Sequence, residues 1–180
     1  MPRKNKKLPR HLLVIRTSAM GDVAMLPHAL RALKEAYPEV KVTVATKSLF
    51  HPFFEGVDVG FLDIETRRTH RGIRGAIRFA REAAELKIDA VADMHNVLRS
   101  KMVRAALHLR GIPVSVIHKG RIEKYMRLGR GSEGVKPLKH TVIRYCDVFR
   151  RLGFDFPDPR PAEKRPRPNP MGEKQGICCL

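Results

Sequence analysis

The sequence has 180 residues, which is enough for one domain of ordinary size and too short for two. Hydrophobic residues make up 43% and charged residues 30%, a composition that excludes a disordered or fibrous chain. The 36 Lys and Arg outnumber the 18 Asp and Glu, and the net charge of +18 favours anionic partners such as nucleic acid, an acidic membrane surface or phosphorylated ligands.

The N-terminal segment and the cysteines indicate the compartment. A basic arm covers residues 1–10, and the apolar run after it, Leu12–Ile15, is too short for a signal peptide or a membrane span. The three cysteines contain no C-x-x-C pair for zinc, and the adjacent Cys178 and Cys179 are poor disulfide partners. We therefore expect a soluble, cytoplasmic protein that can lie peripherally against the inner face of a membrane.

Strands alternate with helices along the chain. Leu12–Ile15 is a short continuous apolar run, typical of a strand buried on both faces. Helical spacing of apolar residues follows from Val23 to Tyr37, and Pro27 within it predicts a late start or a kink. The same patterns predict further strands at 40–45, 57–64, 88–93 and 113–117, and helices at 49–55, 72–86, 98–109 and 138–152.

This alternation predicts an α/β fold, a Rossmann-like domain with a doubly wound parallel sheet. The character of the sequence changes after Gly153, where prolines at short intervals separate polar and charged residues. Such a composition is typical of a linker or a disordered tail. We therefore predict a basic arm at 1–10, one domain at 11–154 and a Pro-rich linker or tail at 155–180.

The loop after the first strand is the first candidate site. Ligands of open α/β sheets bind at the carboxyl ends of the strands, where this loop lies. Gly21 allows close approach of a ligand to the backbone, and the start of the next helix can bind an anion. Asp22 can act as a general base that takes a proton from an acceptor hydroxyl. On position alone, an ordinary helix N-cap is the simpler interpretation of Asp22.

Three motifs carry a family resemblance. Ile15–Val23 reads I-R-T-S-A-M-G-D-V and, with Leu26-Pro27 and Leu30–Leu33 after it, resembles the opening "V-I-R-x-S-A-x-G-D-V" of the heptosyltransferase-like glycosyltransferases of family 9. Ile88–Ser100 is similar to that family's segment "Y-D-x-V-I-D-x-Q-x-x-x-R-S". His140–Arg144 resembles its helix start "H-x-v-x-R". The resemblance covers about residues 11–154.

The resemblance implies the N-terminal half of a GT-B glycosyltransferase, an enzyme in which two Rossmann-like domains face each other across a cleft. In this family the N-terminal domain receives the acceptor, a phosphorylated lipid-linked oligosaccharide of the lipopolysaccharide core. The C-terminal domain holds the nucleotide-sugar donor, usually ADP-heptose, as a cosubstrate, and no other cofactor is expected. Asp22 corresponds to the family's proposed catalytic base, and the transfer is inverting and needs no metal.

Two departures from the family limit this expectation. A complete enzyme of this kind needs roughly twice the length of this chain, so the donor-binding C-terminal domain is expected to be missing. We therefore expect the chain alone to have weak activity or none, because transfer needs donor and acceptor held together. In addition, His95 stands where the family commonly has Gln.

Two clusters of basic residues are candidates for contact with acceptor phosphates or with an anionic membrane. The first runs from Arg67 and Arg68 along one face of the helix expected at 72–86, with Arg71, Arg74, Arg78 and Arg81. The second extends from His118 to Arg130. For a single arginine, a solvated surface position is the simpler interpretation. The predicted acceptor-binding residues are Ser18, Met20, Gly21, Arg67, Arg68, His95, Arg121, His140 and Arg144.

Other signals are weaker. Residues 129–134 fit G-x-G-x-x-G, but they neither follow a strand nor open a helix, so a flexible loop is the better interpretation. No phosphate-binding G-x-x-x-x-G-K and no D-x-D occur. His140 begins a helix, where it either contacts the acceptor or lies on the surface. Asp93 ends the fourth strand, either as a ligand-facing carboxylate or, more simply, as the cap of the next helix.

An alternative function is a basic nucleic-acid-binding α/β module. The net charge and the basic arm favour it, whereas the absence of Trp, the three Tyr and the lack of a recognisable binding motif count against it. A third possibility is a folded but inert fragment of a larger protein.

Overall fold

The computed structural model describes residues 8–65, 70, 72–118 and 139–159. They contain a parallel five-stranded sheet in the order β3-β2-β1-β4-β5. Its strands are β1 (His11–Ile15), β2 (Lys41–Thr46), β3 (Gly60–Asp63), β4 (Ala90–Asp93) and β5 (Val114–Val116). Ile15, the last residue of the central strand, pairs with Ala45 on one side and with Asp93 on the other. The loops that follow β1 and β4 therefore begin side by side.

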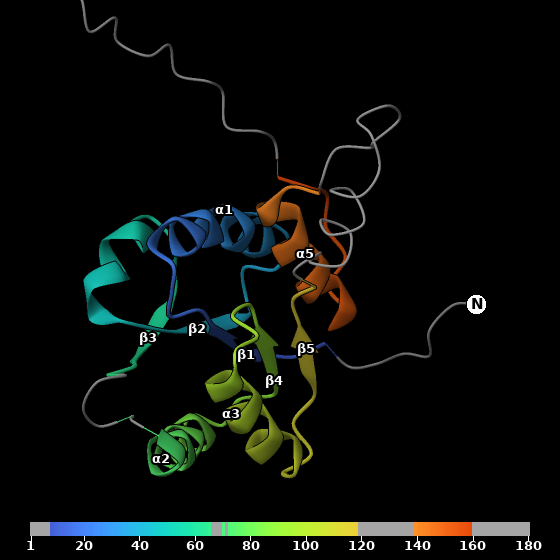
Figure 1. Cartoon of the computed structure of the whole chain (residues 1–180). Helices are drawn as coiled ribbons and strands as arrows, with labels where there is room; N and C mark the ends of the chain where they lie inside the picture. The colour runs from blue at the N-terminus through green and yellow to red at the C-terminus, as the bar shows by residue number, and fades with distance from the viewer. Residues whose placement is uncertain (1–7, 66–69, 71, 119–138, 160–180) are drawn as a thin grey trace, which may run out of the picture.

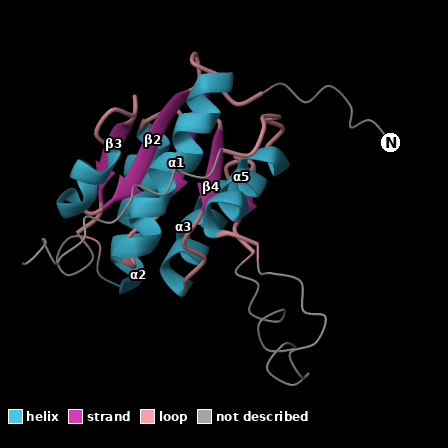
Figure 2. Ribbon diagram, turned by 90° about the horizontal axis from the view of Figure 1, so that it is seen from above, coloured by secondary structure: helices cyan, strands magenta, loops and turns pink. Residues whose placement is uncertain are grey.

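Helices cover both faces of the sheet (Figure 1). On one face, α1 (Met20–Ala36) packs against α5 (Thr141–Arg151) and against the 3-10 helix η1 (Ser48–Phe54). On the other, α2 (Gly72–Glu85) packs against α3 (Leu98–His108). Figure 2 shows α1 lying over the sheet with β2 and β3 to one side and β4 to the other. This arrangement confirms the predicted α/β class with a doubly wound parallel sheet.

The alternation of side chains along β1 divides the interior into two cores. Leu12 and Val14 belong to the core beneath α1 and α5, and Leu13 and Ile15 belong to the core beneath α2 and α3. All four side chains are buried, as expected of a strand with both faces covered. Phe156, two residues beyond the predicted end of the domain, is also buried and joins the first core.

The predicted elements are of the right type, but several boundaries differ. β3 begins at Gly60 rather than at 57, β4 begins at Ala90 rather than at 88, and α5 begins at Thr141 rather than at 138. The late start expected from Pro27 is wrong, because α1 begins at Met20 and Pro27 lies inside it. A late start would have placed Pro27 in the first turn of the helix, where proline is tolerated. Instead, seven helical residues precede it.

Candidate functional site

The candidate site lies at the carboxyl edge of the sheet, where the loops after β1 and β4 meet. The backbone N–H of Met94 donates to the carbonyl of Ile15 at 3.1 Å, which joins the two loops directly. All strands of the sheet are parallel, so the loop that follows each strand begins at this edge. The site predicted from the first loop is therefore placed where ligands of this fold class bind.

Asp22 is held by Arg16, the first residue after β1. Its carboxylate Oδ2 accepts a hydrogen bond from the Arg16 guanidinium, which also donates to the backbone carbonyl of Met94. Arg16 is buried, whereas the side chain of Asp22 is 45% exposed. The ion pair fixes the orientation of a carboxylate that solvent or a substrate hydroxyl can still reach. Such a group is able to accept a proton from a bound hydroxyl.

The interpretation of Asp22 as a helix N-cap is wrong. The N-cap of α1 is Ala19, which has no side-chain capping bond, and Asp22 lies three residues later in the first turn. A carboxylate in that turn is favoured by the helix dipole whether or not it caps the helix. The side chain is thus free of a capping bond and is committed to Arg16 instead.

Tyr145 of α5 supports this arrangement from the other helix. Its hydroxyl donates to the backbone carbonyl of Asp22 at 3.0 Å, and its ring lies 5.9 Å from the Arg16 guanidinium carbon. Burial raises the pKa of Tyr145 to about 12, so the hydroxyl stays protonated and remains a donor. Neither Tyr145 nor the role of Arg16 was predicted from the sequence, although Arg16 stands within the first motif.

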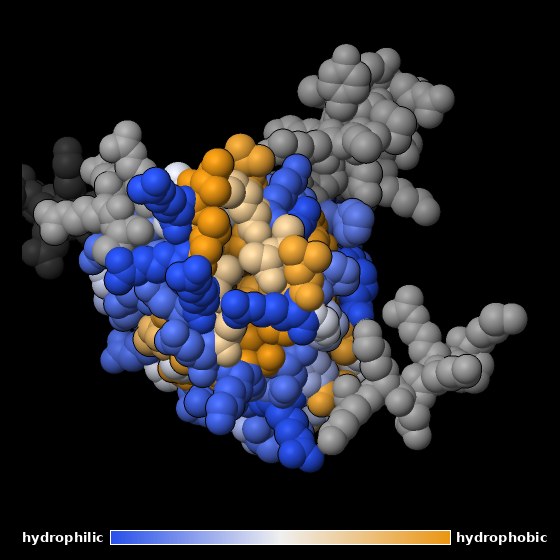
Figure 3. All heavy atoms as spheres, turned by 90° about the horizontal axis from the view of Figure 1, so that it is seen from below, coloured by the Kyte–Doolittle hydropathy of each residue, from blue (hydrophilic) through white to orange (hydrophobic). Residues whose placement is uncertain are grey.

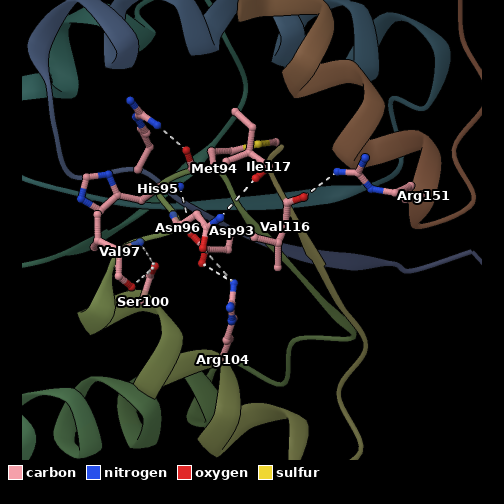
Figure 4. Close-up of polar contacts among 11 residues, drawn as sticks. Asp93, Met94, His95, Asn96, Val97, Ser100, Arg104, Val116, Ile117 and Arg151 are labelled. Atoms are coloured by element: carbon pink, nitrogen blue, oxygen red, sulfur yellow. Dashed lines mark hydrogen bonds and ion pairs between the residues drawn. The ribbon is translucent and has the colours of Figure 1, made fainter. Parts of the chain in front are cut away.

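Asp93, at the end of β4, is a structural carboxylate (Figure 4). It is fully buried, and its Oδ1 accepts hydrogen bonds from the backbone N–H groups of His95 (2.9 Å) and Asn96 (2.8 Å). Its Oδ2 lies 3.4 Å from the Arg104 guanidinium of α3. The expectation that Asp93 caps the next helix is wrong, because the N-cap of α3 is Val97. Asp93 instead fixes the turn that carries His95 into the site.

His95 and Ser18, two of the predicted acceptor-binding residues, lie close together in the structure. Nε2 of the half-buried His95 ring lies 3.5 Å from the Ser18 hydroxyl, across the junction of the two loops. Met20 is exposed, and a side chain at Gly21 would meet no atom within 4 Å, so the protein itself does not require glycine there. This open space beside Asp22 leaves room for a ligand at the start of α1.

His140 and Arg144 lie at the start of α5. The ring Nδ1 of His140 accepts a hydrogen bond from the backbone N–H of Val142 at 3.4 Å, so His140 is the N-cap of the helix. Arg144, the residue before Tyr145, donates to the carbonyl of Lys139 at 2.9 Å. The predicted acceptor residues Arg67, Arg68 and Arg121 lie outside the described residues, as do Arg71 and nearly all of the second basic cluster.

A cavity of about 430 Å³ opens beside this site, between the first turns of α2 and α3. His70 is buried in its wall: its Nδ1 accepts from the backbone N–H of Glu65 at 3.1 Å, and its Nε2 lies 3.0 Å from Glu82. Burial by itself would raise the pKa of Glu82, but hydrogen bonds from Arg78 and His70 outweigh it and lower the pKa. Glu82 is therefore ionised at neutral pH and holds the ring in place.

Within the described ranges, no three His, Cys, Asp or Glu side chains come together as a metal site. None of the helices described is both long enough and apolar enough to cross a membrane.

No protein-family model matches the sequence, and no curated protein matches it either. Solved structures do match its fold. E. coli heptosyltransferase WaaC with ADP has a TM-score of 0.56 and 25% identity over 82% of this chain and 49% of its own. A family 9 glycosyl transferase from Veillonella parvula has a TM-score of 0.58 and 17% identity over 80% and 42%. E. coli ADP-heptose lps heptosyltransferase II has a TM-score of 0.51 and 21% identity over 88% and 44%.

These structures are glycosyltransferases of the family that the three motifs resemble, and the likeness covers about four fifths of this chain. The chain spans about half the length of the structures that it matches or somewhat less. The similarities do not favour the nucleic-acid-binding alternative.

Proposed function

We propose that the chain is the acceptor-binding half of a glycosyltransferase. The complete reaction transfers heptose from ADP-heptose to a phosphorylated, lipid-linked oligosaccharide of the lipopolysaccharide-core type. A second, donor-binding domain outside these 180 residues holds the nucleotide sugar. The similarity in fold to half of a heptosyltransferase structure supports this assignment, and so do the three motifs.

The observation that carries the proposal is the position of Asp22. Its carboxylate lies in the first turn of α1, at the carboxyl edge of the sheet, with its direction set by Arg16 and open space at Gly21 beside it. In the proposed reaction an acceptor hydroxyl hydrogen-bonds to Asp22, and its oxygen attacks the anomeric carbon of the sugar. The bond from that carbon to the nucleoside diphosphate breaks, and the hydroxyl proton passes to Asp22. This single displacement inverts the anomeric centre and needs no metal ligand from this chain.

The other predicted acceptor residues position the acceptor. Ser18, Met20 and His95 border the place where the hydroxyl binds, and Arg67, Arg68 and Arg121 contact the acceptor phosphates. His140 and Arg144, at the start of α5, complete the acceptor side. Arg16 and Tyr145 are positioning residues, because they hold the carboxylate and the backbone of Asp22 respectively.

The size of the active species is the first test. We expect the 180-residue chain alone to show no repeated turnover, because losing the donor half forfeits positioning worth about 7–11 kcal/mol. The intact mass of the protein purified from its own cells decides between two sources of the donor domain. A mass about twice that of this chain places both domains in one chain, and the mass of this chain alone requires a partner.

Replacement of Asp22 is the second test, carried out in the species that turns over. We expect Asp22→Asn to lower kcat by about 10²- to 10⁴-fold with little change in KM, because only the proton acceptor is lost. Asp58→Asn is the matched control: its exposed carboxylate pairs with Lys34 before β3, at the opposite edge of the sheet, and kcat should be unchanged. A kcat within about threefold of the unsubstituted enzyme for Asp22→Asn would show that Asp22 is not the base.

A further inference from the structure

The cavity between α2 and α3 has apolar walls. Its volume of about 430 Å³ lies in the range of small-molecule sites. Its lining residues come from the end of β1 and the loop after it, from the segments that follow β3 and β4, and from the first two turns of α2 and α3. The apolar ones include Ile64, Ile73, Phe79, Leu98, Met102 and Val103. A ligand group that enters it would be surrounded mainly by hydrocarbon.

The wall contains three buried polar residues, Thr17, His70 and Ser100, and the last two are already hydrogen-bonded within the protein. Both ring nitrogens of His70 are used, one by the backbone N–H of Glu65 and the other by Glu82. The Ser100 hydroxyl accepts from the N–H of Val97 and donates to the carbonyl of the same residue, each at 3.0 Å. A polar ligand group would compete with these bonds, whereas an apolar group gains free energy by leaving water. The chemistry of the wall therefore favours a hydrocarbon.

Exposed apolar side chains lie on both helices that line this cavity. Ile73 is 67% exposed and Ile77 is 47% exposed on α2, and Leu98 is 75% exposed at the start of α3. Figure 3 shows a hydrophobic band across the face of the molecule that carries these helices, bordered by hydrophilic side chains. A contiguous exposed patch of this kind marks an interaction surface rather than a solvated face.

A basic stripe runs beside the apolar band on the same helix. Arg74, Arg78 and Arg81 are exposed and, together with Ile77, line a second, shallow hollow. Their spacing of four and three residues keeps them on one side of α2, next to the stripe of Ile73 and Ile77. The helix thus presents hydrocarbon and positive charge side by side, which is the complement of an anionic amphiphile.

We propose that this face is a binding site for an anionic phospholipid of a membrane. A hydrocarbon chain of the lipid enters the cavity between α2 and α3, and its phosphate lies on the stripe of Arg74, Arg78 and Arg81. The site adjoins the edge that carries Asp22, so it would bring a lipid-linked acceptor to the base. In that respect the inference rests on the proposed function, although lipid binding itself is measured without any sugar donor.

The test compares two matched double variants in binding to vesicles. Ile73→Gln with Arg74→Gln removes one aliphatic side chain and one positive charge from the proposed site. Leu109→Gln with Arg110→Gln removes the same two groups from an exposed position beyond the far end of α3. With vesicles of phosphatidylglycerol and phosphatidylcholine, we expect the first pair to weaken binding by about tenfold or more, since one arginine alone is worth about fivefold. The control pair should stay within about twofold.

Three results would overturn the proposal. The first is equal loss in both pairs, which would mean that the net charge alone attracts the chain. The second is equal binding to vesicles of pure phosphatidylcholine, which would exclude a role for the anionic group. The third comes from soluble probes: we expect dioctanoyl-phosphatidylglycerol to bind and glycerol 3-phosphate not to bind, and the reverse order would exclude the cavity. Circular dichroism of both pairs confirms that they are folded.

These measurements stay separate from those on the proposed function. If Asp22→Asn leaves kcat unchanged but the vesicle result holds, the lipid site stands and the base is elsewhere. If Asp22→Asn lowers kcat but both double variants bind vesicles equally, the base stands and the lipid site does not.

Discussion

The two faces of the sheet are covered by similar pairs of helices but are filled differently. Beneath α1 and α5, the side chains of Leu30, Tyr145 and Phe149 are fully buried and form a continuous core with β1. Beneath α2 and α3, the core is interrupted at the carboxyl edge by a cavity of about 430 Å³, and Ile73 remains largely exposed beside it. The same architecture thus holds a dense face and an open face.

This difference matches the chemistry that each face supports. Asp22 belongs to the dense face, where Arg16 and Tyr145 fix its carboxylate and its backbone through partly buried contacts. A base needs such fixed placement, because proton transfer depends on hydrogen-bond geometry. On the open face, the side chains that line the cavity have no packing partners on the cavity side, so a ligand can contact them there. We infer that the dense face positions the carboxylate of Asp22, whereas the open face provides space for a ligand.

Replacing one phenylalanine on each face gives the largest expected effects. Phe149→Ala should lower the free energy of unfolding by about 3–5 kcal/mol, because a fully buried ring is removed from a closed core. Phe79→Ala should cost less, about 2–3 kcal/mol, because one side of that ring already borders the cavity. Urea unfolding of the two variants measures both values. An equal or larger loss for Phe79→Ala would mean that the open face is packed as tightly as the dense one.

Replacing two helical glycines by alanine should change the free energy of unfolding by smaller amounts and in opposite directions. A Cβ at Gly75 of α2 would lie 2.1 Å from the carbonyl carbon of His70, so Gly75→Ala must displace backbone in the wall of the cavity. We expect a loss of about 1–3 kcal/mol in unfolding free energy. A Cβ at Gly21 of α1 meets nothing within 4 Å, and Gly21→Ala should stabilise the helix by about 0.5–1 kcal/mol.

Thermal unfolding followed by circular dichroism measures this pair, with each variant as the other's control. The contrast fails if both substitutions shift Tm in the same direction. If both substitutions raise Tm, the close approach of α2 to His70 relaxes without cost; if both lower it, Gly21 is required at its position.

The fold was predictable because its signals are local. Each buried strand is a short apolar run such as Leu12–Ile15, and each helix has a 3.6-residue apolar period, so the type and order of the elements follow from the sequence. The boundaries were less predictable. Val57 and Val59 read as the start of a strand but pack against the core before the ladder of β3 begins at Gly60.

The site was only partly predictable, since its polar partners are distant in sequence. The motif placed Asp22 correctly at the edge of the sheet, but its pairing with Arg16 rather than with the helix backbone depends on the loop conformation. Tyr145 approaches Asp22 from a helix more than a hundred residues away, and nothing local to either residue indicates this contact. The cavity has no sequence signal at all, because it is formed by residues from two helices and from the segments after β1, β3 and β4, which are distant from one another in the sequence.

The smallest expected effect distinguishes the two faces by pH. His11 lies on the open face with Leu13 and Ile15, and its Nε2 lies 2.8 Å from the Thr43 hydroxyl. Burial, with the nearby charge of Lys41, lowers the pKa of His11 below its usual 6.5. The unfolded chain then binds a proton at a higher pH than the folded one. The free energy of unfolding therefore falls as the pH drops through 6.5, and it stops falling below the lowered pKa of His11.

His11→Gln should remove this contribution, and urea unfolding at about pH 7.5 and about pH 5.5 should show a smaller loss of stability in the variant. If the change in unfolding free energy between the two pH values were the same in the variant, protonation of His11 would cost nothing. It would then follow that the amino end of β1 opens to water before the open face unfolds.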